Sequence, residues 1–233
     1  MSLLKRRLLY QKVKSKGRIM TKKREVSPNL VQNHPQRGIF RQHSVLSDKL
    51  LAGHYYHVYN RGCNREDIFA NPGNYLFLLQ RTKEFLKDYP LSVIAYCLMP
   101  NHYHFLLRPE EDEGLSPFIQ RLFSSYTQAF NKQQNRSGTL FEGRAKSILV
   151  DTDEYALHLC RYIHLNPLKA KLVTHLSKWP YSNYPEWAGQ RNGILVDQAF
   201  VQEYFPNAKD YEAFVMNGID SSLEEKLLPY YLD

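Results

Sequence analysis

Two histidines stand one residue apart in a stretch of β character, Tyr96–Pro109 (YCLMPNHYHFLLRP). Side chains of a strand alternate between its two faces, so His102 and His104 point to one side while Tyr103 and Phe105 point to the other. Two neutral imidazoles at this spacing can turn nitrogen atoms toward one divalent ion. A second interpretation stays open, in which both are ordinary histidines of a sheet, because a bare His-x-His pattern arises easily by chance.

A tyrosine in the next helical stretch, Tyr126, is the candidate reacting group. It continues an apolar stripe that predicts a helix packed on the sheet. The stripe before it comprises Leu115, Phe118, Ile119, Leu122 and Phe123. If this helix crosses the face that carries the histidines, the Tyr126 hydroxyl becomes a nucleophile beside a metal-bound phosphate. If it does not, Tyr126 is a core residue whose hydroxyl finds a hydrogen-bond partner.

The elements that would position these residues follow the order β, α, β, β, α, β. In chain order they span residues 54–62, 74–87, 91–99, 102–108, 115–134 and 147–150. Pro100 and Asn101 predict a tight turn between the second and third strands. This order is the split βαβ pattern, so the sequence predicts an α+β protein with a ferredoxin-like antiparallel sheet.

A helical extension follows the predicted sheet. Residues 152–166 begin with Thr152 or Asp153 as a cap, and Pro167 is expected to end this helix. The chain is therefore expected to comprise an arm (1–50), a catalytic core (51–151) and a helical extension packed on the core (152–233).

Positive charge is concentrated in the arm, where residues 1–50 hold 13 Lys and Arg against two acidic residues, while residues 51–233 hold 18 against 21. This composition favours a flexible tail attracted to polyanions, although a leader before a second start at Met20 fits equally well. No apolar run approaches the roughly 20 residues of a membrane span. The three cysteines form no CxxC pair, so we expect a cytoplasmic protein without disulfides.

Several stretches together resemble the HUH single-tyrosine transposases, and among these the REP-associated tyrosine transposases. They cover about residues 54–190 in unbroken order. The stretches are YNRG (59–62), MPNHYHFLL (99–107), the helix with Tyr126, GTLFEGRAKS (138–147) and RYIHLNPLKAKLV (161–173). The last two are far more specific than His-x-His alone.

The resemblance implies a metal-dependent transposase that cleaves and rejoins single-stranded DNA near hairpins. It implies that His102 and His104 bind Mg²⁺ or Mn²⁺, and that Tyr126 attacks the scissile phosphate to leave a 5′-phosphotyrosine and a free 3′-OH. Related transposases often carry a Gln four residues after the tyrosine as a further metal ligand. Here that position is Phe130, which leaves Asn131, a water or a phosphate oxygen as the third ligand.

A positively charged DNA path is also implied by the resemblance. The residues expected to contact DNA are Asn60, Arg61, Arg144, Lys146, Arg161 and Lys169. Each of them is otherwise a solvated charge or a turn residue. His57 and His164 are expected to be structural. We expect a monomer or a homodimer associated with the nucleoid.

Two other functions are compatible with parts of this pattern. A domesticated relative would bind hairpin DNA or RNA without cutting and would keep the same motif residues. An unrelated metal hydrolase could also use His-x-His, but such a barrel needs about 250 residues of alternating strands and helices. The predicted strands are too few for that architecture.

Overall fold

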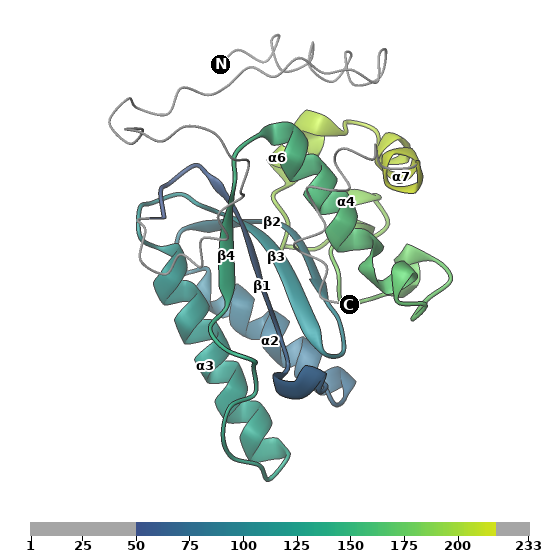
Figure 1. Cartoon of the computed structure of the whole chain (residues 1–233). Coiled ribbons are helices and arrows are strands. Elements are labelled where there is room, and N and C mark those ends of the chain that lie inside the picture. The colour runs from purple at the N-terminus through teal and green to yellow at the C-terminus, as the bar shows by residue number, and fades with distance from the viewer. Residues whose placement is uncertain (1–49, 218–233) are drawn as a thin grey trace, which may run out of the picture. The chain divides into compact units, whose positions relative to one another are not determined.

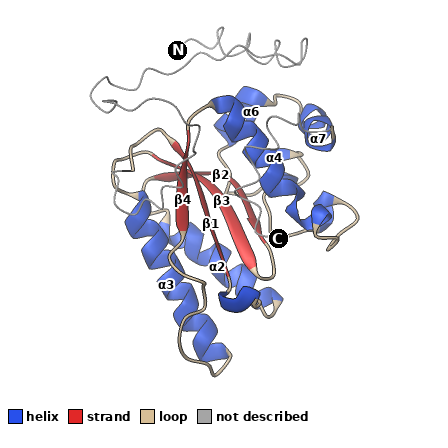
Figure 2. Ribbon diagram, in the orientation of Figure 1, coloured by secondary structure: helices blue, strands red, loops and turns tan. Residues whose placement is uncertain are grey.

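Four strands form one antiparallel sheet in the order β2-β3-β1-β4 (Figures 1 and 2). The computed structural model describes residues 50–217, so the basic arm, apart from Leu50, lies outside the described residues. The strands are β1 (Tyr55–Arg61), β2 (Leu91–Leu98), β3 (His102–Pro109) and β4 (Lys146–Val150). The two central strands are β1 and β3, and the strand that follows each helix lies at an edge, as in a split βαβ fold. The predicted ferredoxin-like α+β fold is confirmed.

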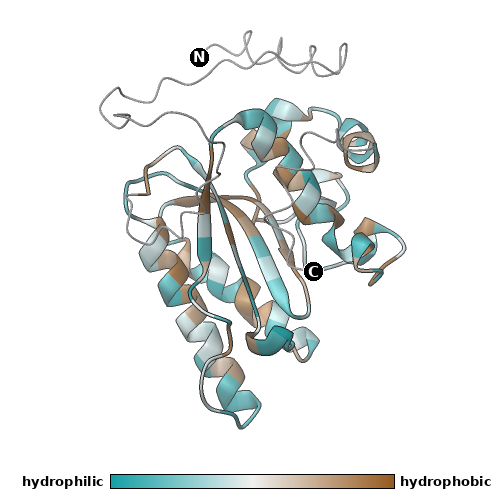
Figure 3. Ribbon diagram, in the orientation of Figure 1, coloured by the Kyte–Doolittle hydropathy of each residue, from teal (hydrophilic) through white to brown (hydrophobic). Residues whose placement is uncertain are grey.

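Helices α2 (Pro72–Phe85) and α3 (Leu115–Gln133) cover one face of this sheet (Figure 1). Helix α2 begins two residues before its predicted start, because Asn71 is its N-cap and Pro72 suits the first helical position. The buried side of α3 is the predicted apolar stripe. Figure 3 shows hydrophobic and hydrophilic residues alternating along α3, as expected for a helix with one buried side.

Helix α4 (Asp153–Lys169) covers the opposite face of the sheet and contacts β2, β3 and β4. Its N-cap is Thr152, whose hydroxyl accepts a hydrogen bond from the Tyr155 backbone N–H at 3.1 Å. The remaining helices are short: η2 (Cys63–Arg65), η3 (Leu176–Lys178), α5 (Tyr184–Trp187), α6 (Gln198–Tyr204) and α7 (Ala208–Met216). Within residues 50–217, no helix has the length and apolar character needed to cross a membrane.

Helix α4 continues through Pro167, where the sequence predicts its end. Proline has no N–H to donate to the carbonyl oxygen four residues earlier, which here belongs to Ile163. The side-chain amide of Asn166 lies near this oxygen, with its Nδ2 3.5 Å from the Ile163 oxygen and 2.9 Å from the Tyr162 oxygen. The Asn166 side chain thus replaces part of the lost backbone bonding, and the helix extends to Lys169.

Candidate active site

The two histidines of β3 lie on the sheet face that α4 covers. Their ring centroids are 5.2 Å apart, and the His104 ring contacts Tyr162 of α4. Tyr103, between them, points to the other face, where it stacks on Phe123 of α3 at 4.1 Å. The strand alternation predicted from the sequence therefore holds, and it separates the two faces into a histidine face under α4 and an apolar face under α2 and α3.

Tyr126 lies on the apolar face, so the structure does not bring it to the histidines. Its side chain is 1% exposed, its ring packs 5.3 Å from that of Phe69, and its hydroxyl donates a hydrogen bond to the Ile68 carbonyl. Burial raises the pKa of this hydroxyl above its ordinary value. This corrects the expectation that the two histidines hold an ion over Tyr126, since the sheet itself separates the two sites.

Asn131, the expected third ligand, follows Tyr126 on the same helix. Its side-chain Nδ2 donates to the Gly138 carbonyl at 2.9 Å, which ties the end of α3 to the following turn. Because α3 packs on the apolar face, Asn131 does not join the histidines. The structure assigns it a local role in that turn.

A different tyrosine, Tyr162 of α4, contacts His104, one of the two histidines of β3. Its ring lies edge-to-face on His104, with centroids 5.4 Å apart and planes at 79°. The sequence contains a signal for this residue. The pattern of a tyrosine followed four residues later by a side-chain amide is absent at Tyr126, where that position is Phe130. The pattern is present at Tyr162, where that position is Asn166 in the stretch YIHLN.

Asn166 stands one helical turn after Tyr162 and is buried. Residues four apart share one side of a helix, so the side chains of Tyr162 and Asn166 belong to the same side of α4, the side that faces the sheet. The Asn166 Nδ2 donates to backbone oxygens of α4. Its Oδ1 is therefore the atom of this side chain that is suited to bind a cation.

His104 is fully buried and contacts a third histidine, His57 of β1. The distance from His57 Nε2 to His104 Nδ1 is 3.0 Å. Burial lowers the pKa of His57 to about 3, and burial together with the neighbouring histidines lowers the pKa of His104. Both rings are therefore neutral at pH 7, which is the form in which imidazole binds metals.

The donor set fits a divalent cation. Within residues 50–217, the buried Nε2 of His104 has no hydrogen-bond partner, as expected for an atom reserved for a ligand. The described residues contain no group of three His, Cys, Asp or Glu side chains placed to hold a metal. Any third protein donor among these residues is therefore of another type, such as the amide oxygen of Asn166.

Two of the expected DNA contacts lie beside the histidine face. Lys169 Nζ is 5.6 Å from the ring centroid of Tyr162, and Lys146 Nζ is 5.6 Å from that of Tyr59. Tyr59 in turn lies 5.9 Å from the His104 ring. Both lysines are exposed, so their ammonium groups add positive charge at the edge of the site.

Arg61 is also on this face, directly across the strand pair from His102. Its guanidinium forms a two-pronged ion pair with Glu142, with Nη2 3.0 Å from Oε1 and Nε against the other oxygen. Asn60 points to the other face and donates to the Gly143 carbonyl at 2.9 Å. Asn60 thus holds the loop before β4, and the structure does not present its side chain to the site.

The last two expected DNA contacts differ in exposure. Arg144 is exposed in the loop before β4. Arg161 is only 3% exposed, and its guanidinium carbon lies 5.4 Å from the Phe214 ring centroid in α7. This corrects the expectation of a surface contact for Arg161, because α7 covers that side of α4.

His164, expected to be structural, is buried between α4 and the C-terminal segments. Its Nε2 lies 2.8 Å from Asn183 Oδ1 and its Nδ1 2.5 Å from the Tyr211 hydroxyl. Asn183 also bonds the β2 backbone, since its Oδ1 accepts from Tyr96 N at 2.7 Å. His164 lies two residues after Tyr162 in α4, so these bonds attach this part of the helix to the β2 edge of the sheet.

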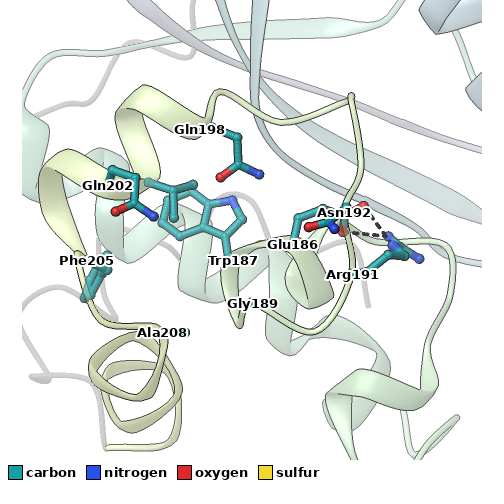
Figure 4. Close-up of a pocket in the computed structure, with 10 residues that line it drawn as sticks. Glu186, Trp187, Gly189, Arg191, Asn192, Gln198, Gln202, Phe205 and Ala208 are labelled. Atoms are coloured by element: carbon teal, nitrogen blue, oxygen red, sulfur yellow. Dashed lines mark hydrogen bonds and ion pairs between the residues drawn. The ribbon is translucent and has the colours of Figure 1, made fainter.

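A cavity of about 190 Å³ lies in the C-terminal part, away from the residues predicted for catalysis (Figure 4). Its charged residues, Glu186 and Arg191, already form an ion pair with both nitrogen-to-oxygen distances at 2.7 Å. The other lining residues are Trp187, Gly189, Asn192, Gln198, Val201, Gln202, Phe205 and Ala208. None of the expected site residues lines this cavity, so we assign the candidate site to the histidine face.

Several known proteins are similar to this chain. Residues 51–166 match the family described as transposase IS200 like, and this match includes β1, β3 and α4 as far as Asn166. A Haemophilus influenzae protein described as a REP-associated tyrosine transposase is 28% identical over 159 residues, covering 52% of this chain and 90% of that protein. The REP-associated tyrosine transposase of Escherichia coli is 27% identical over 114 residues, covering 44% of this chain and 66% of that protein.

A solved structure shares the fold. It is a REP-associated tyrosine transposase bound to a REP hairpin, with a TM-score of 0.53 and 18% sequence identity. The similarity covers 71% of this chain and 94% of that one. At this level of identity it shows a common fold alone.

Proposed function

The chain belongs to the IS200-like transposase family through residues 51–166, and on this premise we propose that it cleaves and rejoins single-stranded DNA with Tyr162 as the nucleophile. The observation that carries the proposal is the contact of Tyr162 with His104, on the face that also holds His102. Phosphoryl transfer to a side chain requires a hydroxyl beside the metal-binding imidazoles, and the ring contact with His104 supports Tyr162 as its source.

The proposed reaction exchanges one phosphodiester for another. The Tyr162 oxygen attacks the scissile phosphorus and loses its proton, and the bond from phosphorus to the 3′ oxygen breaks. The leaving 3′ oxygen takes up a proton, so the products are a 5′-phosphotyrosine and a free 3′-OH. Attack by another 3′-OH reverses these steps and rejoins DNA without an external energy source.

His102, His104 and the Asn166 amide oxygen are the residues that would hold a divalent cation, Mg²⁺ or Mn²⁺. When bound, such an ion would polarise the phosphate and neutralise part of its charge. Lys169, Lys146 and Arg61 would bind neighbouring phosphates. Tyr162 is 2% exposed, so DNA must displace the atoms that cover its hydroxyl before the reaction.

We propose hairpin DNA with an adjacent single strand as the substrate, as the related structure bound to a REP hairpin suggests. Tyr162 and His104 belong to the same chain and contact each other. A monomer therefore supplies the nucleophile and both histidines, although a homodimer is compatible with this geometry. We place the reaction in the cytoplasm at the nucleoid, where the DNA substrate is found.

The test is covalent capture of DNA. The full chain is incubated with labelled single-stranded hairpin DNA from the flanks of its own gene and with Mg²⁺ or Mn²⁺. We expect a protease-sensitive adduct that disappears with Tyr162→Phe or chelator and persists with the matched control Tyr126→Phe. An adduct that depends on Tyr126 and not on Tyr162 would refute the assignment. Binding without any adduct would support the alternative of a non-cutting hairpin-binding protein.

A further inference from the structure

Each of the two candidate metal-binding histidines has a neighbouring side chain at its Nδ1 atom. For His104 the neighbour is His57, with Nε2 3.0 Å away. For His102 it is Asn101, with Oδ1 2.7 Å away. In both cases the contact involves Nδ1, so the ring nitrogen available to a metal is Nε2.

We propose that His57 and Asn101 are positioning residues that hold His104 and His102 as the tautomers protonated on Nδ1, so that both Nε2 lone pairs are directed to the cation. The inference rests on the proposed function, because the cation site belongs to it. Neither residue would touch DNA or metal. Their role is to fix the tautomer and the ring orientation of the residues that do, as outer hydrogen bonds do in characterised metal sites.

The case for Asn101 follows from the chemistry of the amide. Its Nδ2 donates to the Arg65 carbonyl at 3.4 Å, which places Oδ1 against His102. An amide oxygen only accepts hydrogen bonds, so His102 must donate from Nδ1. When the ring carries this one proton, its lone pair is on Nε2.

The backbone around Asn101 is fixed by the loop after β1. Gly62 N donates to the Asn101 carbonyl at 2.8 Å, and Ile68 N donates to the Pro100 carbonyl at 2.8 Å. A side chain at Gly62 would not fit, because its Cβ would lie 2.0 Å from the Glu66 carbonyl oxygen. The YNRG stretch thereby gains a role: it holds the turn that carries Asn101.

The case for His57 follows from its contact with His104 Nδ1, which allows two tautomer pairs. If His57 donated to His104 Nδ1, the neutral His104 ring would carry its proton on Nε2. That pair would leave no lone pair on Nε2 for a cation. If His104 donates instead, its Nε2 carries a lone pair, as a metal ligand needs. The His57 ring is held in place by stacking on Tyr59 at 4.7 Å.

The first test measures Mn²⁺ affinity without DNA or turnover, by electron paramagnetic resonance of the free ion in titrations of the full chain. We expect His57→Leu and Asn101→Leu each to weaken Mn²⁺ binding by about 10–100-fold. Asn101→Asp keeps an acceptor oxygen, and His57→Gln offers one, so both are expected to retain more affinity than the leucine variants. Tyr126→Phe, on the other face, is the control and should bind as the wild-type chain does.

A second measurement needs no variant of His57 and covers the case in which His57→Leu does not fold. Nitrogen NMR of ¹⁵N-histidine-labelled, metal-free protein distinguishes protonated from unprotonated ring nitrogens, with assignments from variants of His102 and His104. We expect protonated Nδ1 and unprotonated Nε2 in both. A protonated Nε2 in His104 would overturn the role of His57, as would unchanged Mn²⁺ affinity in a folded His57→Leu chain.

Failure of this inference differs from failure of the proposed function. If the wild-type chain forms the DNA adduct while the leucine variants bind Mn²⁺ normally, the enzyme assignment stands and the positioning role is wrong. If the wild-type chain binds no Mn²⁺, the positioning role is overturned. If it forms no adduct but shows the expected tautomers and Mn²⁺ affinities, the metal site stands without the strand-transfer function.

Discussion

Tyr162 of α4 meets His104 of β3 edge-to-face, with ring centroids 5.4 Å apart. Two elements far apart in the sequence create this contact, because α4 lies across the face of the sheet that α2 and α3 leave open (Figure 1). The helix is attached there by His164, which bonds Asn183 at 2.8 Å. The position of the proposed nucleophile therefore depends on residues that have no part in the proposed chemistry.

The two buried tyrosines should respond in opposite ways to loss of the hydroxyl. Tyr126→Phe leaves the Ile68 carbonyl without its donor, so we expect a loss of about 1–3 kcal/mol in the free energy of unfolding and normal adduct formation. Tyr162→Phe should abolish the adduct. Urea unfolding and the adduct assay, run on both variants, check this. An unchanged stability in Tyr126→Phe would show that its hydrogen bond contributes nothing.

Asn166 is expected to act through the cation. Asn166→Ala removes the amide oxygen, and we expect the Mn²⁺ concentration for half-maximal adduct formation to rise about 10-fold or more. The matched control is Asn131→Ala, which removes an amide from α3 and should leave that concentration unchanged. Titration of Mn²⁺ in the adduct assay measures both. Equal effects of the two substitutions would exclude Asn166 as the third ligand.

Local patterns predicted the elements, whereas the pairing of faces needed tertiary information. The alternation at His102–Phe105 and the stripe of α3 are properties of neighbouring residues, so both were correct. Which helix covers which face depends on how the chain crosses the sheet. A comparison of the faces would have helped, because the side of β3 that carries Phe105 and Leu107 is apolar and suits the α3 stripe better than the histidine side does.

The proposed third ligand, Asn166, and the end of α4 both depend on side-chain contacts that the local sequence pattern does not show. The general effect of proline predicts that the helix ends at Pro167, but Asn166 supplies hydrogen bonds that replace part of what proline removes. A helix that ends at this point makes the stretch YIHLN a helix terminus, whereas in the structure its tyrosine and amide belong to a continuous helix over the sheet.

The ion pair of Arg61 with Glu142 should weaken DNA binding by competing for the guanidinium. In Glu142→Gln the competing charge is removed, so we expect tighter binding of single-stranded DNA. Arg61→Gln should weaken binding and reduce the magnitude of the salt dependence by about 0.7 per lost phosphate contact. Fluorescence anisotropy across a salt series measures both effects. Glu84→Gln, which breaks a similar exposed pair with Arg81 on α2, is the control.

Stability should fall as the pH is lowered, in part because of His164. Burial lowers its pKa from 6.5 to about 4, so between these values the unfolded chain binds a proton that the folded chain does not. The free energy of unfolding is therefore expected to decrease as the pH falls from about 7 to 4, and His164 contributes up to about 3 kcal/mol of this change.

Urea unfolding of the wild-type chain and of His164→Gln at pH 7.5 and pH 4.5 isolates this contribution. The variant loses hydrogen bonds and should be less stable at pH 7.5, but its loss on acidification should be smaller than that of the wild-type chain. His57 and His104 titrate in both proteins, so the difference between the two pH dependences belongs to His164. Identical pH dependences would mean that His164 is protonated as readily in the folded chain as in the unfolded one, in conflict with its burial between Asn183 and Tyr211.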